Sequence, residues 1–191
     1  VLRALCDLGG RASVEELVAR SSLADAAVAR AVLTLVSQNL ATEQVVQWTE
    51  LSCTEEGLMC VGSGLPERRV VDLFPENGGR LPIGEAVREA GLGLEYVPIV
   101  SGWLARKGWG KVEKQKGVIM AVVEKKPARD EDEELTERIG RKTVALEELS
   151  AKLQEAADRL LRRNLLESRV RTRRVDQVTE AGTRAVPAEI V

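Results

Sequence analysis

The sequence predicts an α+β fold, mostly helical, made of three consecutive modules that each contain three helices and a β-hairpin. Three observations predict it: a long internal repeat, helix stop signals at matching positions of the repeats, and a polar strand pattern after each stop. With 44% hydrophobic and 30% charged residues, the composition is that of an ordinary folded globular chain. No apolar run reaches the length of a membrane span, so the fold is expected to need no membrane.

The repeat aligns two 20-residue stretches without a gap. QNLATEQVVQWTELSCTEEG at 38–57 matches RNLLESRVRTRRVDQVTEAG at 163–182, and a fainter copy contains GWGKVEKQKG. Asn and Gly tolerate the left-handed conformation that closes a helix, so Asn39, Gly108 and Asn164 are predicted to end three equivalent helices. Apolar residues recur at helical spacing before each of them.

Shorter helices are predicted ahead of these three. In the first module, Gly9 and Gly10 stop one helix, and Ser13 with Glu16 forms a capping box for the next. The second module has helices over 65–74 and 82–90, and Pro98 suits the first turn of its third helix. In the third module the acidic run 130–134 favours a helix N-terminus, and that helix is predicted to reach Gly140.

After each predicted helix end, the pattern indicates two short strands around a polar tip, such as Lys114 to Gly117 in the second copy. Helix, helix, helix and hairpin in about 60 residues is the winged helix-turn-helix plan. Clusters of breakers place the boundaries after residues 62 and 128. The predicted domains are therefore module one (1–62), module two (63–128) and module three (129–191).

Charge is unevenly shared between the modules. Module one has 4 basic and 8 acidic residues, module two has 11 and 8, and module three has 13 and 14. In module three the arginines gather at the third helix and the hairpin, while the acids gather at its first helix. On a strand, Arg169, Arg171 and Arg173 would share one face by the period of two, and an arginine-rich wing is suited to contact phosphates. The candidate cluster is Arg159, Arg162, Arg163, Arg169, Arg171, Arg173 and Arg174.

The sequence offers no catalytic or metal-binding residues. It contains no histidine, and its three cysteines, Cys6, Cys53 and Cys60, lack metal-ligand spacing and are expected to be small buried hydrophobes in a reducing compartment. Phosphate-cradling glycine loops are missing as well. Trp103 is expected to pack between modules or to face a partner, and Trp109 to enter the core from the first strand of module two.

GLPERRVVDL, the GWLARKGW stretch and the two hairpin ends TEEG and TEAG resemble the N-terminal region of the phenylalanyl-tRNA synthetase α subunit of the archaeal and eukaryotic type. The resemblance covers essentially the whole chain. In that family, three winged-helix-like modules precede a class II catalytic domain and help an (αβ)₂ enzyme to hold tRNA. Pro98, near the start of a third helix, departs from the family plan.

The resemblance implies a cytoplasmic, tRNA-binding region without catalytic residues of its own, with phenylalanine-specific tRNA and the β subunit as partners. ATP and Mg²⁺ would belong to the catalytic domain, and no cofactor is expected in these residues. The resemblance also adds Arg68, Arg69, Lys107 and Lys111 to the candidate RNA-binding residues. Two alternatives remain open: a tandem winged-helix transcriptional regulator bound to DNA, and a module that binds other proteins.

Overall fold

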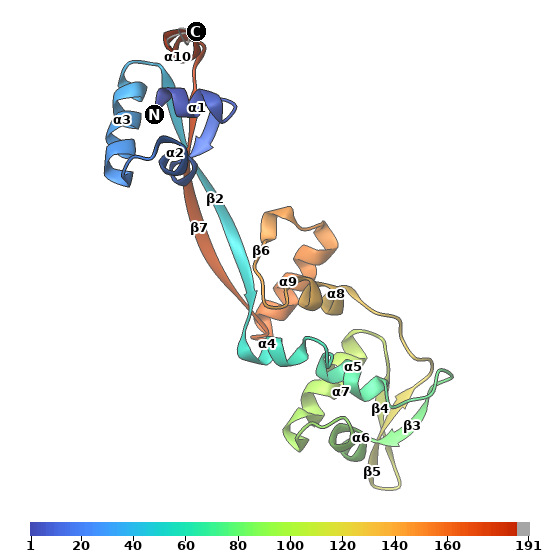
Figure 1. Cartoon of the computed structure of the whole chain (residues 1–191). Coiled ribbons are helices and arrows are strands. Elements are labelled where there is room, and N and C mark those ends of the chain that lie inside the picture. Colours follow the sequence, from blue (N-terminus) through green and yellow to red (C-terminus); the bar gives the residue numbers. More distant parts are fainter. Residues whose placement is uncertain (187–191) are drawn as a thin grey trace. The chain divides into compact units, whose positions relative to one another are not determined.

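The computed structural model describes residues 1–186, which divide into two compact units. Unit 1 consists of residues 1–49 together with the chain from Val170 onward, and unit 2 consists of residues 50–169. The α+β class is confirmed, with two antiparallel sheets (Figure 1). The units do not coincide with the three predicted modules, which remain a description of the sequence repeats. No helix among the described residues is long and apolar enough to cross a membrane.

Unit 1 is built on helices whose ends follow local side-chain chemistry. The Ser13–Glu16 capping box is present: the Ser13 hydroxyl accepts from the Glu16 amide at 3.3 Å and the Glu16 carboxylate accepts from the Ser13 amide at 2.7 Å. Leu5, Leu17 and Val28 are fully buried and form the centre of its core. Its elements are α1 (Leu2–Asp7), β1 (Arg11–Ser13), α2 (Val14–Ser21), α3 (Asp25–Ser37), α10 (Glu180–Ala185) and parts of β2 (Ala41–Cys53) and β7 (Leu166–Val178).

The module two part of unit 2 is a helical layer on a three-stranded sheet of order β3-β5-β4. Its hairpin is present as predicted: Gln115 pairs with Val118, and the two loop residues Lys116 and Gly117 have φ of 49° and 82°. Two positive φ values in a two-residue loop are those of a type I′ turn, which suits the twist of paired strands. The elements are α5 (Pro66–Val71), β3 (Gly79–Pro82), α6 (Ile83–Glu89), η1 (Leu94–Tyr96), α7 (Val97–Arg106), β4 (Lys111–Gln115) and β5 (Val118–Val123).

The module three part of unit 2 packs around Leu135, Leu160 and Leu51, which are all fully buried. Asp130 and Glu133 form a capping box at the start of its first helix, which ends at Gly140 as predicted. Its elements are α8 (Glu131–Ile139), β6 (Val144–Ala145), η2 (Leu146–Glu148) and α9 (Ala151–Arg162), and α4 (Glu55–Cys60) from module one joins them.

All three predicted helix stops are confirmed. Asn39, Gly108 and Asn164 have φ of 58°, 65° and 57°, the left-handed conformation expected at a helix end. In each case the amide of the following residue bonds back to a carbonyl five positions earlier, as Leu40 does to Leu35 at 2.9 Å. This is the Schellman pattern, so the repeat is a repeat of helix-ending hydrogen bonds.

The hairpins predicted in modules one and three are wrong. Residues 41–53 and 166–178 are two uninterrupted strands of 13 residues each, β2 and β7, and they pair with each other (Figure 1). The bonds from Thr54 N to Leu165 O and from Thr179 N to Leu40 O, both 3.0 Å, fix the register at the two ends. The physical reason is visible in the residues: QVVQWTE and RVRTRRV contain no Gly, Asn or Pro with which to turn.

Each TExG motif therefore docks on the other repeat. The Thr54 hydroxyl donates to Asn164 O and the Thr179 hydroxyl donates to Asn39 O, both at 2.7 Å. Gly57 and Gly182 lie so close to the opposing chain that an added Cβ would be 2.0 Å from Leu165 O or Leu40 O, respectively. The two repeats have exchanged their second half-strands, so unit 1 contains a segment of module three and unit 2 contains a segment of module one.

We expect Gly182→Ala to lower the free energy of unfolding of unit 1, and Gly57→Ala that of unit 2, by about 1–3 kcal/mol each, because the new methyl group must displace a backbone carbonyl. Amide hydrogen exchange reports the two units separately. Gly102→Ala is the control: an added Cβ meets nothing within 4 Å there, so it should be neutral or stabilising. Equal effects of all three variants would contradict the proposed close approach.

Candidate nucleic-acid interface

Four of the eleven predicted binding residues lie inside unit 2, where they neutralise buried carboxylates. The side chains of Arg68, Lys107 and Arg163 are 12%, 8% and 9% exposed, and that of Arg159 is 37% exposed. Each is within ion-pair distance of an acidic side chain. These ion pairs are structural contacts within unit 2, and contact of the same four residues with RNA stays a prediction.

Glu67 is the centre of this network. It is fully buried on α5, and Arg163, just after α9, donates two parallel hydrogen bonds of 2.8 Å to its two oxygens. Lys107 Nζ, just after α7, lies 2.8 Å from Glu67 Oε1. A bidentate guanidinium–carboxylate pair has a defined geometry as well as charge, so it fixes the orientation of the three helix ends.

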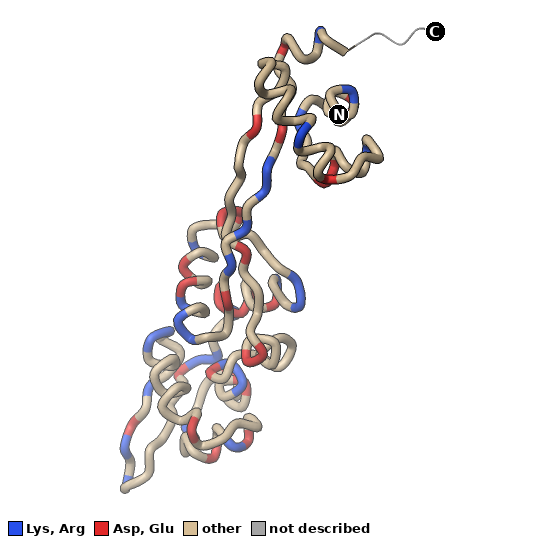
Figure 2. The backbone as a smooth tube through the Cα atoms, turned by 90° about the vertical axis from the view of Figure 1, so that its left-hand side faces the viewer, with Lys and Arg blue, Asp and Glu red and all other residues tan. Residues whose placement is uncertain are grey.

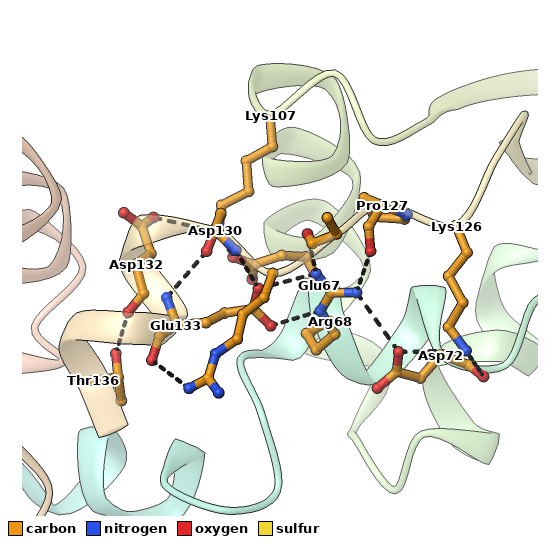
Figure 3. A network of polar contacts seen from close by, with 12 residues as sticks. Glu67, Arg68, Asp72, Lys107, Lys126, Pro127, Asp130, Asp132, Glu133 and Thr136 are labelled. Carbon is orange, nitrogen blue, oxygen red and sulfur yellow. Dashed lines mark hydrogen bonds and ion pairs between the residues drawn. The ribbon is translucent and has the colours of Figure 1, made fainter. Parts of the chain in front are cut away.

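Lys107 also lies between two carboxylates at the N-terminus of α8 (Figure 3). Its Nζ is 2.7 Å from Asp130 Oδ2 and 3.3 Å from Asp132 Oδ2. Arg159 on α9 donates to Asp132 Oδ1 from Nε at 2.9 Å and lies 2.8 Å from it through Nη2. The acidic run that favours the helix N-terminus therefore also binds cations from modules two and three.

Arg68 joins module two to the same helix. Its guanidinium donates to both oxygens of Glu133, at 2.6 and 2.9 Å, and to the carbonyls of Pro127 and Ala128 at 2.9 and 2.7 Å (Figure 3). Glu133 accepts at the same time from the Asp130 amide at 2.9 Å. Arg68 therefore binds the backbone of the predicted linker at Pro127 and Ala128, and Glu133 binds the backbone just after it at Asp130.

These contacts set the ionisation of the network. Burial alone would raise the pKa of Glu67, but the hydrogen bonds and charge of Arg163 and the charge of Lys107 outweigh it and hold that pKa below its ordinary value. Burial alone would lower the pKa of Lys107. The charge of Glu67 and the contact with Asp130 outweigh burial, so the pKa of Lys107 lies above its ordinary value. Both groups are therefore charged at neutral pH.

The two tryptophans of module two cover this network. Trp109 has Arg68 at 4.4 Å and Lys107 at 4.6 Å from its ring centroid, and it packs on the module two core as predicted. Trp103 has Arg163 at 4.2 Å and Arg106 at 5.0 Å from its ring centroid. Trp103 therefore contacts module three, one of the two positions expected for it, and both rings contribute cation–π contacts.

A cavity of about 670 Å³ opens beside these rings. It is lined by both tryptophans, by paired ions of the network, and by Arg106 and Arg162. Arg162 is exposed on α9. The remaining predicted residues of module two lie elsewhere: Arg69 is half-buried near Gly91, and Lys111 is an exposed strand residue 2.8 Å from Glu113.

The arginines of RVRTRRV lie along the middle of β7 rather than at the tip of a wing (Figure 2). Arg169, Arg171, Arg173 and Arg174 are all exposed. In a strand the first three share one face, as predicted, and Arg174 lies on the other. Arg169 is the last residue of unit 2, whereas Arg171 and Arg173 belong to unit 1.

Trp48, which the sequence did not single out, lies on the same face as Arg171 and Arg173. The end bonds of the β2–β7 pair place it opposite Arg171, and its ring centroid is 5.9 Å from Arg173 Cζ. The two repeats are offset by 125 residues, so Trp48 corresponds to Arg173 in the second repeat. This correspondence was the sequence signal that could have added Trp48 to the candidate residues. We call Trp48, Arg171 and Arg173 the arginine–tryptophan face.

Among the described residues, no group of three or more His, Cys, Asp and Glu side chains is arranged to hold a metal ion. The three cysteines are free and partly buried, and burial raises the pKa of the Cys53 and Cys60 thiols.

Comparison with known sequences identifies the class of protein. No family model matches the chain. It is 32% identical over 181 residues to the phenylalanine–tRNA ligase alpha subunit of Thermococcus gammatolerans, covering 93% of this chain and 35% of that protein. With the same subunit of Methanopyrus kandleri it shares 27% identity over 182 residues, 91% of this chain and 35% of that protein. These relatives are subunits of aminoacyl-tRNA ligases.

The chain belongs to the phenylalanine–tRNA ligase alpha-subunit family and corresponds to its N-terminal region. A shorter match, 37% identical over 110 residues, links it to the subunit of Methanothermobacter thermautotrophicus, covering 58% of this chain and 20% of that protein. The chain spans about a third of the length of the relatives that it matches over most of its own length.

Proposed function

We propose that this region binds tRNA for a phenylalanine–tRNA ligase, through the arginine–tryptophan face of β2 and β7. The observation that carries the proposal is the pair Arg171 and Arg173, two exposed guanidinium groups on one face of a strand in a chain whose net charge is −2. Local positive charge on an otherwise acidic chain favours a defined docking site for a polyanion over general attraction. Because the relatives are phenylalanine–tRNA ligase subunits, the proposed RNA partner is phenylalanine-specific tRNA.

Within this proposal the eleven candidate residues divide into three sets. The set proposed to contact RNA directly is exposed, with Arg171 and Arg173 at its centre and Arg162 and Arg169 nearby in sequence. The buried set acts indirectly, because Arg68, Lys107, Arg159 and Arg163 hold the helices of unit 2 in place. The third set is peripheral: Arg69 and Lys111 are secondary RNA contacts, and Arg174 lies on the other face of β7.

We further propose that the ligase assembles with a β subunit in the cytoplasm, and that ATP, Mg²⁺ and the aminoacylation chemistry belong to the part of the relatives that these residues do not match. The winged-helix interpretation is retained in modified form: modules one and three would be winged-helix units that have exchanged strands. Binding of DNA by a recognition helix is disfavoured, since Arg30 is the only basic residue of α3.

A protein-binding role for module one is supported by one observation. The solvent-facing side of α3 carries Leu33, which is 66% exposed. An exposed leucine of this size on a helix surrounded by small residues is suited to contact a protein rather than a phosphate backbone. This role is compatible with RNA binding by β7.

We expect the double variant Arg171→Ala/Arg173→Ala to bind tRNA more weakly and with less dependence on salt. If both side chains contact phosphates, the slope of log affinity against log salt should become shallower by about 1.4, or 0.7 per contact. Titration of the 191-residue chain with tRNA at several salt concentrations measures both quantities.

Arg174→Ala is the control, because it removes one positive charge from the other face of the same strand, whereas the double variant removes two. It should change the affinity and the slope much less than the double variant. An effect of Arg174→Ala half as large as that of the double variant would show that only the total charge matters. An unchanged slope in the double variant would exclude this face as the RNA contact.

A further inference from the structure

Trp48 is a large aromatic side chain that the protein leaves partly open. It lies near the end of the unit 1 part of β2, and it belongs to none of the three core clusters of the described residues. Its neighbours in the chain, from Thr42 to Gln47, are all exposed, so no helix of unit 1 covers this stretch of the strand pair. By contrast, Trp103 and Trp109 pack against ion pairs and core residues of unit 2.

Two arginines lie beside Trp48. Arg171 lies opposite it on β7, and the Arg173 guanidinium carbon is 5.9 Å from the centre of its ring. At that distance Arg173 lies within the range of a cation–π contact but leaves much of the ring surface open. Val46, 37% exposed, lies beside Trp48 on the same face.

An open indole between two guanidinium groups matches the chemistry of an unpaired nucleotide. Bases that are not in a duplex stack on aromatic side chains, while the flanking phosphates bind arginine. An A-form duplex hides the faces of its bases, so it would use the arginines and leave the indole without a partner. We propose that Trp48 stacks on an unpaired base of the bound RNA, which places a loop or single-stranded segment on this face; the inference rests on the proposed RNA-binding function.

The test compares two substitutions at Trp48. Trp48→Leu keeps an apolar side chain on the strand but removes the aromatic face, and Trp48→Phe keeps a smaller aromatic face. Loss of one base–aromatic stack corresponds to an affinity about 5- to 150-fold lower. We expect a loss in that range for Trp48→Leu with tRNA and with a single-stranded RNA, little loss with a duplex RNA of the same length, and largely retained binding for Trp48→Phe.

The salt dependence separates this inference from the proposed function. Because no charge is removed, the slope against salt should be the same in Trp48→Leu and in the unchanged chain, whereas Arg171→Ala/Arg173→Ala should flatten it. Val46→Ala controls for loss of apolar surface on the same face and should bind normally. Circular dichroism and amide exchange of unit 1 establish that each variant is folded.

Each outcome decides between the two ideas. Normal binding by Trp48→Leu, together with weaker binding by the arginine variant, would overturn the stacking inference and leave the RNA-binding function standing. Loss of binding with a flattened slope, or an equal loss with duplex RNA, would mean that Trp48 only positions the arginines and would also overturn it. If neither Trp48→Leu nor the arginine variant changes tRNA binding, both the inference and the proposed function are wrong.

Discussion

Replacing Glu67 by glutamine is expected to lower the free energy of unfolding of unit 2 by about 3–5 kcal/mol, a large share of the stability of a small domain. The substitution keeps the shape of the side chain but leaves Arg163, which is 9% exposed, facing a neutral amide. Lys107, which is 8% exposed, loses one of its three carboxylates and keeps Asp130 and Asp132. Removing one partner of a buried ion pair strands the other charge away from water, and that desolvation is the source of the loss.

Urea unfolding followed by the fluorescence of Trp103 and Trp109, which lie against the network, measures this effect. Glu76→Gln is the matched control: it removes the same charge from unit 2 at a side chain that is 84% exposed, so its effect should stay below about 1 kcal/mol. Similar midpoints for the two variants would show that the network contributes little to stability.

The pH dependence of the same contact has a definite sign. The pKa of Glu67 in the folded chain is held below its ordinary value of 4.5. The unfolded chain therefore binds a proton at a higher pH than the folded chain, and the free energy of unfolding falls as the pH drops below about 4.5. Above that pH the stabilisation from Glu67 is fully present, and Glu67→Gln should lack this part of the acid sensitivity.

Replacing Asp176 by leucine is expected to stabilise unit 1 by about 1–3 kcal/mol near pH 7.5. Asp176 is fully buried on β7, opposite Ala12 of β1, and neither of its carboxylate oxygens has a hydrogen-bond partner. Its counterpart at the offset of 125 is Leu51, a fully buried core residue of unit 2. The substitution therefore places in unit 1 the residue type that the other repeat uses at the equivalent position.

Burial has the largest effect on Asp176 and raises its pKa, and the negative charge of Glu43 across the strand pair raises it further. The positive charge of Arg174 lowers the pKa by a smaller amount, and the resulting pKa is about 6. Between its ordinary value of 3.8 and about 6, the folded state holds a proton that the unfolded chain has released. The free energy of unfolding of unit 1 should therefore decrease as the pH rises through about 6.

Urea unfolding followed by circular dichroism at pH 5 and at pH 7.5 measures this decrease. Asp176→Asn and Asp176→Leu should both abolish it, because neither side chain titrates, and only leucine should also add stability. Asp158→Leu, at an exposed position of α9, controls for the general effect of the substitution. Loss of stability in Asp176→Leu at pH 7.5 would show that the carboxylate has a partner in solution.

The sequence by itself determined the local structure of this protein. Asn39, Gly108 and Asn164 end their helices, and Ser13 and Asp130 begin theirs, because the hydrogen bonds involved join residues no more than five positions apart. The period of a strand likewise places Arg169, Arg171 and Arg173 on one face whether or not the strand belongs to a hairpin.

Only the tertiary structure decided which strands pair and which charges are buried. Thr54 and Gly57 would fit Asn39 and Leu40 of their own repeat as well as they fit Asn164 and Leu165, because the two repeats carry the same motif. The local sequence therefore does not determine which of the two helix ends each TExG motif binds. The absence of turn residues within β2 and β7 favours binding to the helix end of the other repeat.

Arg163 and Glu67 meet across 96 positions of the sequence. Before packing is known, a charged residue that contacts RNA and one that neutralises a buried carboxylate have the same sequence signature. This is why the sequence alone predicts Arg68, Lys107, Arg159 and Arg163 as RNA contacts without indicating that they also pair with acidic side chains of unit 2. The difference between them is burial, which arises only when distant segments pack together.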